Sequence, residues 1–209
     1  MDVHILSAVT HTGMPITLRP FSSLDTARVC ELCQDPQISM WTTVPNPYTL
    51  EDAEYYIRDY TSVAWREINT KTYTTETEGP ELVWAVWVAD GPLEGLWGSI
   101  GLKRHGDRKV DVGYWLGAGA RGNGIMPAAV RSVIEAAFHP RLPIQATSMW
   151  WYAFEGNKSS AFVAERVGMK YMGLTRSPYC GDRDVMSAVI YPDDPRRSRD
   201  DWPDLGFDD

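Results

Sequence analysis

The stretch from residue 109 to residue 151 changes its hydrophobic period twice, and this change restricts the fold more than any other feature of the chain. Residues 109–117 (KVDVGYWLG) alternate in polarity as a strand does, and residues 143–151 (PIQATSMWW) read as a second strand. The apolar positions between them share one face of a helix: Val130, Val133, Ile134, Ala137 and Phe138. A strand, a helix and a strand in this order form a right-handed crossover, so we expect the two strands to lie parallel.

The rest of the chain predicts further strands and helices of one domain. Short glycine-containing turns separate the strand-like runs 81–89, 96–104 and 109–117, which favours an antiparallel meander. Other strands are expected at 15–21, 169–175 and 184–191, and other helices from Ser22 or Ser23, from Thr49 and over 158–167. Thr49 begins a capping box with Asp52, and the Pro-rich segment 40–49 reads as a loop.

Composition limits the partners that the chain can bind. Asp and Glu number 28 against 20 Lys and Arg, a net charge of −8. Binding to phosphate backbones needs a basic surface, so no nucleic-acid partner is expected, and an amine or cationic substrate fits better. No apolar run reaches the length of a membrane span, and the first residues lack the features of a signal peptide. We therefore expect a soluble, cytoplasmic protein with no membrane partner.

The domain boundaries follow from the same patterns. Residues 1–14 read as an N-terminal extension, 15–191 as a single domain and 192–209 as a tail. The tail from Asp193 on holds seven Asp and three Arg with little apolar content, which predicts loose order. The pair Cys30 and Cys33 has the spacing of half a metal site. No second ligand pair follows, so packing is favoured and no metal is expected.

The turn 120–127 (ARGNGIMP) joins the first strand of the crossover to its helix. Gly122 and Gly124 can adopt positive φ and let a ligand approach the backbone, and Pro127 suits the first helical turn. A helix N-terminus favours an anion, to which Arg121 can add charge-assisted bonds. A tight turn that binds nothing is the alternative. The turn lacks the lysine of a P-loop and the third glycine of a dinucleotide fingerprint.

The sequence around this turn resembles the acyl-CoA-binding segment of the GNAT N-acetyltransferases, and especially their RimJ/RimL branch. The segment VDVGYWLGAGARGNGIMPAAV fits the pattern R/Q-x-x-G-x-G/A, with Met126 in place of the small sixth residue. Three further stretches agree in the expected order: LRPFSSLDTARVCELCQDPQISMW, EGNKSSAFVAERVGM and YCGDRDVMSAVIY. The resemblance covers residues 15–191.

The resemblance implies both a fold and a cosubstrate. The fold is a mixed α/β sheet, mostly antiparallel and six- to seven-stranded, with helices on both faces and one parallel pair of strands that splays apart. The cosubstrate is acetyl-CoA, whose pyrophosphate would lie on the turn and whose pantetheine arm would bond the splayed strand and Asn157. The implied cofactor-binding residues are Trp115, Leu116, Gly117, Arg121, Gly122, Asn123, Gly124, Ile125, Met126, Asn157 and Ser160.

The resemblance also implies catalytic residues, with one departure from the family. Ser160 matches the serine near the CoA sulfur, and its expected contribution is a hydrogen bond to the thiolate. The glutamate that precedes the closing Y-x-x-G segment in RimL-like enzymes is Pro178 here, so the usual carboxylate is missing. Asp111, or alternatively Glu155, is the candidate base. Tyr179 is a candidate on the acceptor side.

The acceptor is expected to be an amine. Trp41, Tyr48, Trp151 and Tyr179 are candidate walls of its site. A weak base suits an α-amine better than a lysine, because more of an α-amine is neutral near pH 7. No histidine lies near Cys180 in sequence, so direct transfer is favoured over an acetyl-cysteine. The resemblance is also compatible with a homodimer. The alternatives are a noncatalytic acyl-CoA sensor and a nucleotide-binding regulatory domain.

Overall fold

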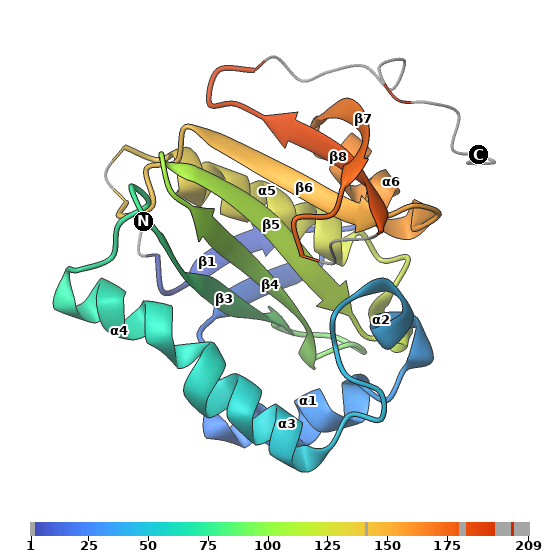
Figure 1. The fold of residues 1–209 in the computed structure, drawn as a ribbon. Coiled ribbons are helices and arrows are strands. Elements are labelled where there is room, and N and C mark those ends of the chain that lie inside the picture. The colour runs from blue at the N-terminus through green and yellow to red at the C-terminus, as the bar shows by residue number, and fades with distance from the viewer. Residues whose placement is uncertain (1–2, 141, 180–182, 195–201, 203–209) are drawn as a thin grey trace.

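An eight-stranded sheet runs through the computed structural model, which describes residues 3–140, 142–179, 183–194 and 202 (Figure 1). The strands are β1 (Leu6–Val9), β2 (Pro15–Arg19), β3 (Glu78–Val88), β4 (Gly95–His105), β5 (Lys109–Leu116), β6 (Ser148–Phe154), β7 (Lys170–Arg176) and β8 (Asp184–Ile190). Their order is β1-β2-β3-β4-β5-β6-β8-β7, and all neighbours are antiparallel except β5 and β6. The predicted meander and parallel crossover are both confirmed.

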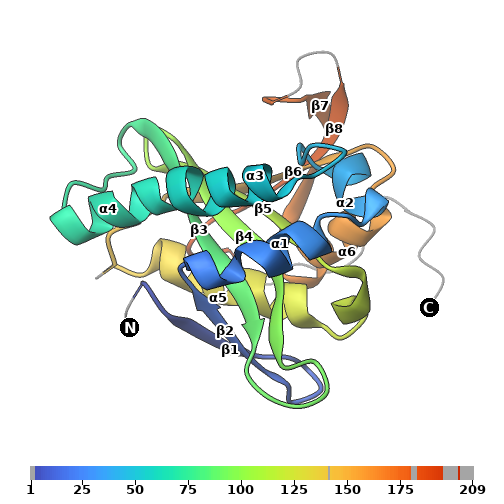
Figure 2. The same ribbon diagram turned by 90° about the horizontal axis from the view of Figure 1, so that it is seen from below.

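Helices cover both faces of this sheet. They are α1 (Thr26–Leu32), α2 (Pro36–Trp41), α3 (Leu50–Tyr55), α4 (Ser62–Thr70), α5 (Ile125–Phe138) and α6 (Lys158–Arg166), and a π-helical segment, Tyr56–Tyr60, joins α3 to α4. Figures 1 and 2 show α1, α3 and α4 on one side of the central strands and α5 on the other. None of the helices in the described part of the chain is both long and apolar enough to span a membrane.

The first long helical segment begins as the capping box predicts. Thr49 Oγ1 accepts a hydrogen bond from the Asp52 N–H at 3.1 Å, and Asp52 Oδ2 accepts from the Thr49 N–H at 2.8 Å. The segment continues through the π-helical turn to Thr70. It ends at Lys71, whose φ of 58° is left-handed.

Three elements differ from the prediction. β1 lies in the presumed extension 1–14 and pairs with β2, which raises the strand count from the expected six or seven to eight. α2 occupies 36–41, where no helix was predicted, because Pro36 sits at its first position and Asp35 caps it; its last two residues therefore fall in the predicted loop 40–49. β6 begins at Ser148 and not at 143. The preceding backbone bonds elsewhere, with the Ala146 N–H donating to Ala137 and the Thr147 N–H to Arg108.

Alternation along the strands produces two apolar cores. The larger contains Leu18, Trp84, Ile100, Val112, Ala129 and Val133, and the smaller contains Val29, Ile57, Ala85, Leu96 and Trp115. Most of the predicted tail lies outside the described residues. Residues 192–194 and Trp202 are described. Trp202 is buried, donates from its indole nitrogen to the Met169 carbonyl at 2.9 Å and contacts the Trp151 and Tyr171 rings.

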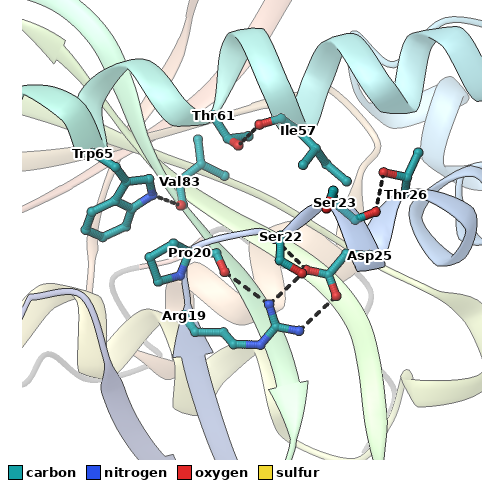
Figure 3. A network of polar contacts seen from close by, with 10 residues as sticks. All are labelled: Arg19, Pro20, Ser22, Ser23, Asp25, Thr26, Ile57, Thr61, Trp65 and Val83. Carbon is teal, nitrogen blue, oxygen red and sulfur yellow. Dashed lines mark hydrogen bonds and ion pairs between the residues drawn. The ribbon is translucent and has the colours of Figure 1, made fainter.

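An ion pair joins β2 to the helical layer above it (Figure 3). Arg19 donates to both carboxylate oxygens of Asp25 at 2.8 Å, and the Ser22 N–H donates to Asp25 as well. Burial alone would raise the pKa of Asp25, but the hydrogen bonds from Arg19 and Ser22 and the charge of Arg19 together lower it. Both Arg19 and Asp25 are therefore charged parts of the fold, held where the first helix begins.

Candidate functional site

A cavity of about 1030 Å³ lies where β5 and β6 part. Pairing between the two strands ends at Val112 opposite Trp151, whereas β5 remains paired with β4 as far as Leu116. The backbone from Gly113 to Leu116 therefore has no strand partner on its β6 side. Residues of α2, α3, β4, β5, α5, β6 and α6 line the cavity. The predicted splay is thus present, and it begins at Gly113, before the predicted 115–117.

The glycine turn forms one end of this cavity. Gly122 and Gly124 have φ angles of 80° and 70°, as the turn requires, and both line the cavity together with Ile125 and Met126. The first N–H groups of α5 have no partner within the helix, so they remain available to an anion. A Cβ added at Gly122 would meet nothing within 4 Å. The turn therefore has the form of an anion cradle.

Arg121 also lines the cavity, and its side chain already has partners within the protein. Its guanidinium pairs with Asp35 at 2.6 Å and donates to the Leu116 carbonyl at 3.0 Å. The side chain thus connects the turn to the start of α2. The side chain of Asn123 donates to the carbonyl oxygens of Ala120 and Arg121, and it holds the shape of the loop.

The start of α6 supplies the second wall. Asn157 caps the helix, and its side chain accepts from the Ser160 N–H at 3.2 Å. The Ser160 hydroxyl accepts from Trp151 Nε1 at 3.0 Å and donates to the Tyr114 hydroxyl at 3.1 Å. Burial raises the pKa of Tyr114, so this phenol remains protonated. Ser160 is therefore held at the cavity wall by partners on β5 and β6.

Aromatic side chains line the cavity along its length. They are Trp41, Tyr48, Tyr55, Tyr56, Tyr60, Tyr152 and Tyr179. Trp41 lies near Gly156, just before α6, whereas Tyr60, Tyr152 and Tyr179 gather near Asp111 and His105 in the half toward the start of β5. Trp41 and Tyr48, two of the predicted acceptor walls, come from α2 and the loop that follows it. The other two are Trp151, on β6, and Tyr179, between β7 and β8. All four side chains predicted to line the acceptor site therefore line this one cavity.

Asp111 lies in the half of the cavity toward the start of β5 and is buried. Its Oδ1 lies 2.9 Å from His105 Nε2, and the Tyr179 hydroxyl lies 3.2 Å from the same nitrogen. The hydrogen bond that His105 donates to the Asp111 carboxylate raises the pKa of His105. Lys103 lies over the Tyr179 ring, 4.4 Å from its centroid. Asp111 is therefore one member of a charged cluster.

Three predicted residues do not line the cavity. Glu155 is exposed in the turn after β6, and Gly117 and Asn123 support the loop from behind. Conversely, Glu81, Tyr60 and Lys103 line the cavity without having been predicted. Glu81 stands at the start of a strand-like run, where a charged residue is typical of solvent exposure, and no sequence motif marked it. Within the described residues, no cluster of histidine, cysteine or acidic side chains could hold a metal ion.

Comparison with known proteins gives a consistent result. RimJ from Mycobacterium smegmatis, solved with a CoA-disulfide, is 18% identical with a TM-score of 0.67, over 90% of this chain and 87% of that chain. An acetyl transferase from Salmonella typhimurium that modifies the N-terminal serine of ribosomal protein L7/L12 is 13% identical with a TM-score of 0.67, over 85% and 95%. MccE, a microcin C7 self-immunity acetyltransferase solved with acetyl-CoA and AMP, is 16% identical with a TM-score of 0.66, over 91% and 99%. At these identities the likeness shows a shared fold.

The mixed sheet, the parted strands and the glycine turn together define an acetyltransferase fold. A family model described as an acetyltransferase (GNAT) domain matches residues 16–170. Because that match covers most of the chain, the chain belongs to the GNAT acetyltransferase family. The likeness to RimJ and to the L7/L12 enzyme agrees with the predicted RimJ/RimL-like branch. No curated protein sequence matches the chain significantly.

Proposed function

We propose that this protein transfers the acetyl group of acetyl-CoA directly to a primary amine. The observation that carries the proposal is the arrangement of the cavity, with an anion cradle at one end and an acidic, aromatic half at the other. The two meet where β5 and β6 part. Acetyl-CoA would supply an activated thioester. The residues that would hold it are Trp115, Leu116, Gly122, Gly124, Ile125, Met126, Asn157 and Ser160, which all line the cavity.

The fit of acetyl-CoA rests on the empty space at the turn. Gly122 has positive φ and no atom near its missing Cβ, so a pyrophosphate can approach the backbone N–H groups. The unpartnered edge of β5 can bond an amide-bearing arm, because strand backbone without a neighbour presents free donors and acceptors. Both features suit a long, phosphorylated thioester better than a compact nucleotide, which would not need the exposed strand edge.

Ser160 is the residue proposed to face the sulfur. Its hydroxyl, positioned by Trp151 and Tyr114, can turn its hydrogen toward a thiolate that forms in the cavity. A hydrogen bond to the charged leaving group lowers the barrier to breaking the C–S bond. Ser160 itself need not lose its proton in this role, since the thiolate can be protonated by another route.

The acceptor half favours a cationic amine with an apolar or aromatic body. Aromatic rings attract cations, and the carboxylates of Glu81 and Asp111 add negative charge. A peptide N-terminal α-amine and a small-molecule amine both satisfy this chemistry. One neighbour modifies the N-terminal serine of a ribosomal protein, which agrees with the first of these. Cys180 lies outside the described residues, and the proposal uses direct transfer without it. The proposed enzyme comprises residues 15–191 and acts in the cytoplasm.

Thiol release tests the proposal. Acetyl-CoA is offered with a panel of peptides, polyamines and aminoglycosides, and free CoA is measured for the wild type, Asp111→Asn and Ser160→Ala. We expect turnover with at least one amine and a fall in kcat of about 10-fold for Ser160→Ala, the size of one lost hydrogen bond to a charged group. Tight binding of acetyl-CoA with no turnover on the whole panel would instead support the noncatalytic sensor.

A pair of glycine variants tests the cradle. Gly122 and Gly91 have φ angles of 80° and 85°, and a Cβ at either would meet nothing within 4 Å. Alanine at either position should therefore cost a similar backbone strain of about 1 kcal/mol. Gly91 lies in the loop between β3 and β4, outside the cavity. We expect Gly122→Ala to raise KM for acetyl-CoA by about 10-fold or more, since 1.4 kcal/mol lost in binding has that effect, and Gly91→Ala to leave it unchanged.

A further inference from the structure

Glu81 reaches the acceptor half of the cavity because β3 and β4 are irregular there. The register of the two strands shifts between Gly79 and Leu82, and the Glu81 side chain lies across β4 above Gly101. A Cβ at Gly101 would overlap Glu81 Oε1. Gly101 therefore provides the space that the carboxylate occupies. Gly113 lies opposite Gly101 on the neighbouring strand β5, and the space above it is empty.

One oxygen of Glu81 is anchored and the other faces the cavity. The Tyr60 hydroxyl donates to Oε2 at 2.6 Å, and the Tyr60 ring stacks on Tyr56 with centroids 5.7 Å apart. Burial and the charge of Glu81 raise the pKa of Tyr60, so it stays protonated and remains a donor. Among the described residues, no hydrogen bond reaches Oε1. This leaves Oε1 available to a ligand.

The surroundings make Glu81 a stronger base than an ordinary carboxylate. Burial raises its pKa most, the hydrogen bond from Tyr60 lowers it, the charge of Asp111 raises it and Lys103 lowers it, with a net rise. Asp111 is differently placed, because its Oδ1 already accepts from His105. Glu81 thus combines a raised pKa with an oxygen that no hydrogen bond reaches among the described residues, and both properties suit it to take a proton.

We propose that Glu81 is the catalytic base that takes a proton from the acceptor ammonium, and that Tyr60 is its positioning residue. The inference rests on the proposed function. The ammonium gives one proton to Oε1 and becomes a neutral amine. Its nitrogen then bonds to the thioester carbon, the C–S bond breaks, and the second nitrogen proton ends on the CoA thiolate. Glu81 returns its proton to solvent, so the products are the amide, CoA thiol and one released proton.

Glu81→Gln tests this role with two kinds of acceptor. An amine that is acetylated in the thiol-release panel is compared with its hydroxylamine analogue, whose nitrogen is already neutral at pH 7. Glutamine keeps the size of the side chain and an oxygen for Tyr60 to donate to. We expect kcat/KM at pH 7 to fall about 100-fold or more for the amine and less than 10-fold for the hydroxylamine, because only the amine needs a base. Glu94→Gln, at an exposed acid of the β3–β4 loop, should change neither.

Tyr60→Phe tests the positioning role through the pH dependence of kcat/KM, which a purely structural role of Tyr60 would leave unchanged. The hydrogen bond from Tyr60 stabilises the charged carboxylate, so its removal should raise the pKa of Glu81 and shift the acid limb of the kcat/KM profile to higher pH. Glu81 would not be the base if Glu81→Gln lowered kcat/KM equally for both acceptors, or if Glu81→Gln kept full activity on the amine. In either case, turnover by the unmutated protein would leave the proposed function intact. A wild type that acetylates no amine would overturn both.

Discussion

Gly113→Leu is expected to lower kcat/KM for acetyl transfer by about 100-fold, a rise of about 2.7 kcal/mol in the barrier, while the protein remains folded. Among the described glycines, Gly113 is the only one with neither a positive φ nor an atom close to where its Cβ would lie. The backbone therefore does not need glycine there. Gly113 lies at the point where β5 leaves β6 and faces the cavity, so a larger side chain would fill the space between the two halves.

A graded series makes this prediction specific. Activity should fall from Gly113→Ala to Gly113→Val to Gly113→Leu as the added volume grows, and the melting temperature should hold or rise because glycine weakens a strand. Thr175→Leu, at an exposed position of β7 outside the cavity, controls for an added surface leucine. If Gly113→Leu retained activity within a factor of about two of the Thr175→Leu control, the space above Gly113 would not belong to the reaction path.

Asp25→Ala is expected to lower the free energy of unfolding by about 3 kcal/mol, the lower end for breaking a buried ion pair. The side chain of Asp25 is 6% exposed and that of Arg19 is 26% exposed, so water can solvate only part of the orphaned guanidinium. The substitution also removes the acceptor of the Ser22 N–H at the start of the first helix. For a chain of this size, the melting temperature should fall by about 6–12 °C.

The pH dependence of this effect follows from the lowered pKa of Asp25. A carboxyl whose pKa is lower in the folded state contributes stability above its unfolded pKa of about 3.9 and loses it as the pH falls through the folded value. The difference in free energy of unfolding between the wild type and Asp25→Ala should therefore have its full size at pH 7 and shrink below about pH 4. Denaturation at several pH values measures it, with the exposed Asp90→Ala as the control.

A double variant separates the ion pair from the rest of the network. Arg19→Met combined with Asp25→Ala removes both charges, so no unpaired ion is left. The double variant should therefore lose less free energy of unfolding than the two single variants lose in sum. Additive losses would show that the pairing of Arg19 with Asp25 contributes little, and that the cap of the helix carries the effect.

The crossover could be predicted from the sequence because its signals are local. The alternation of 109–117, the helical face from Val130 to Phe138 and the glycine turn each depend on neighbouring residues, and the parallel pair follows from chain connectivity. The N-cap at Thr49 was readable for the same reason. β1 was not predicted, because four residues at an edge offer too short a pattern, and the start of β6 depended on distant hydrogen bonds to Arg108 and Ala137.

The candidate site, like the fold, was only partly predictable from the sequence. The sequence by itself determined the glycine turn and the likeness that placed the chain among the acetyltransferases, since each is written in residues close together in the chain. Only the tertiary structure decided which acids line the cavity. It turned Arg121 toward Asp35, left Glu155 in solvent, paired Asp111 with His105 and laid Glu81 over Gly101. These outcomes depend on strand register and on the absence of a side chain at Gly101, and neither can be read from one strand alone.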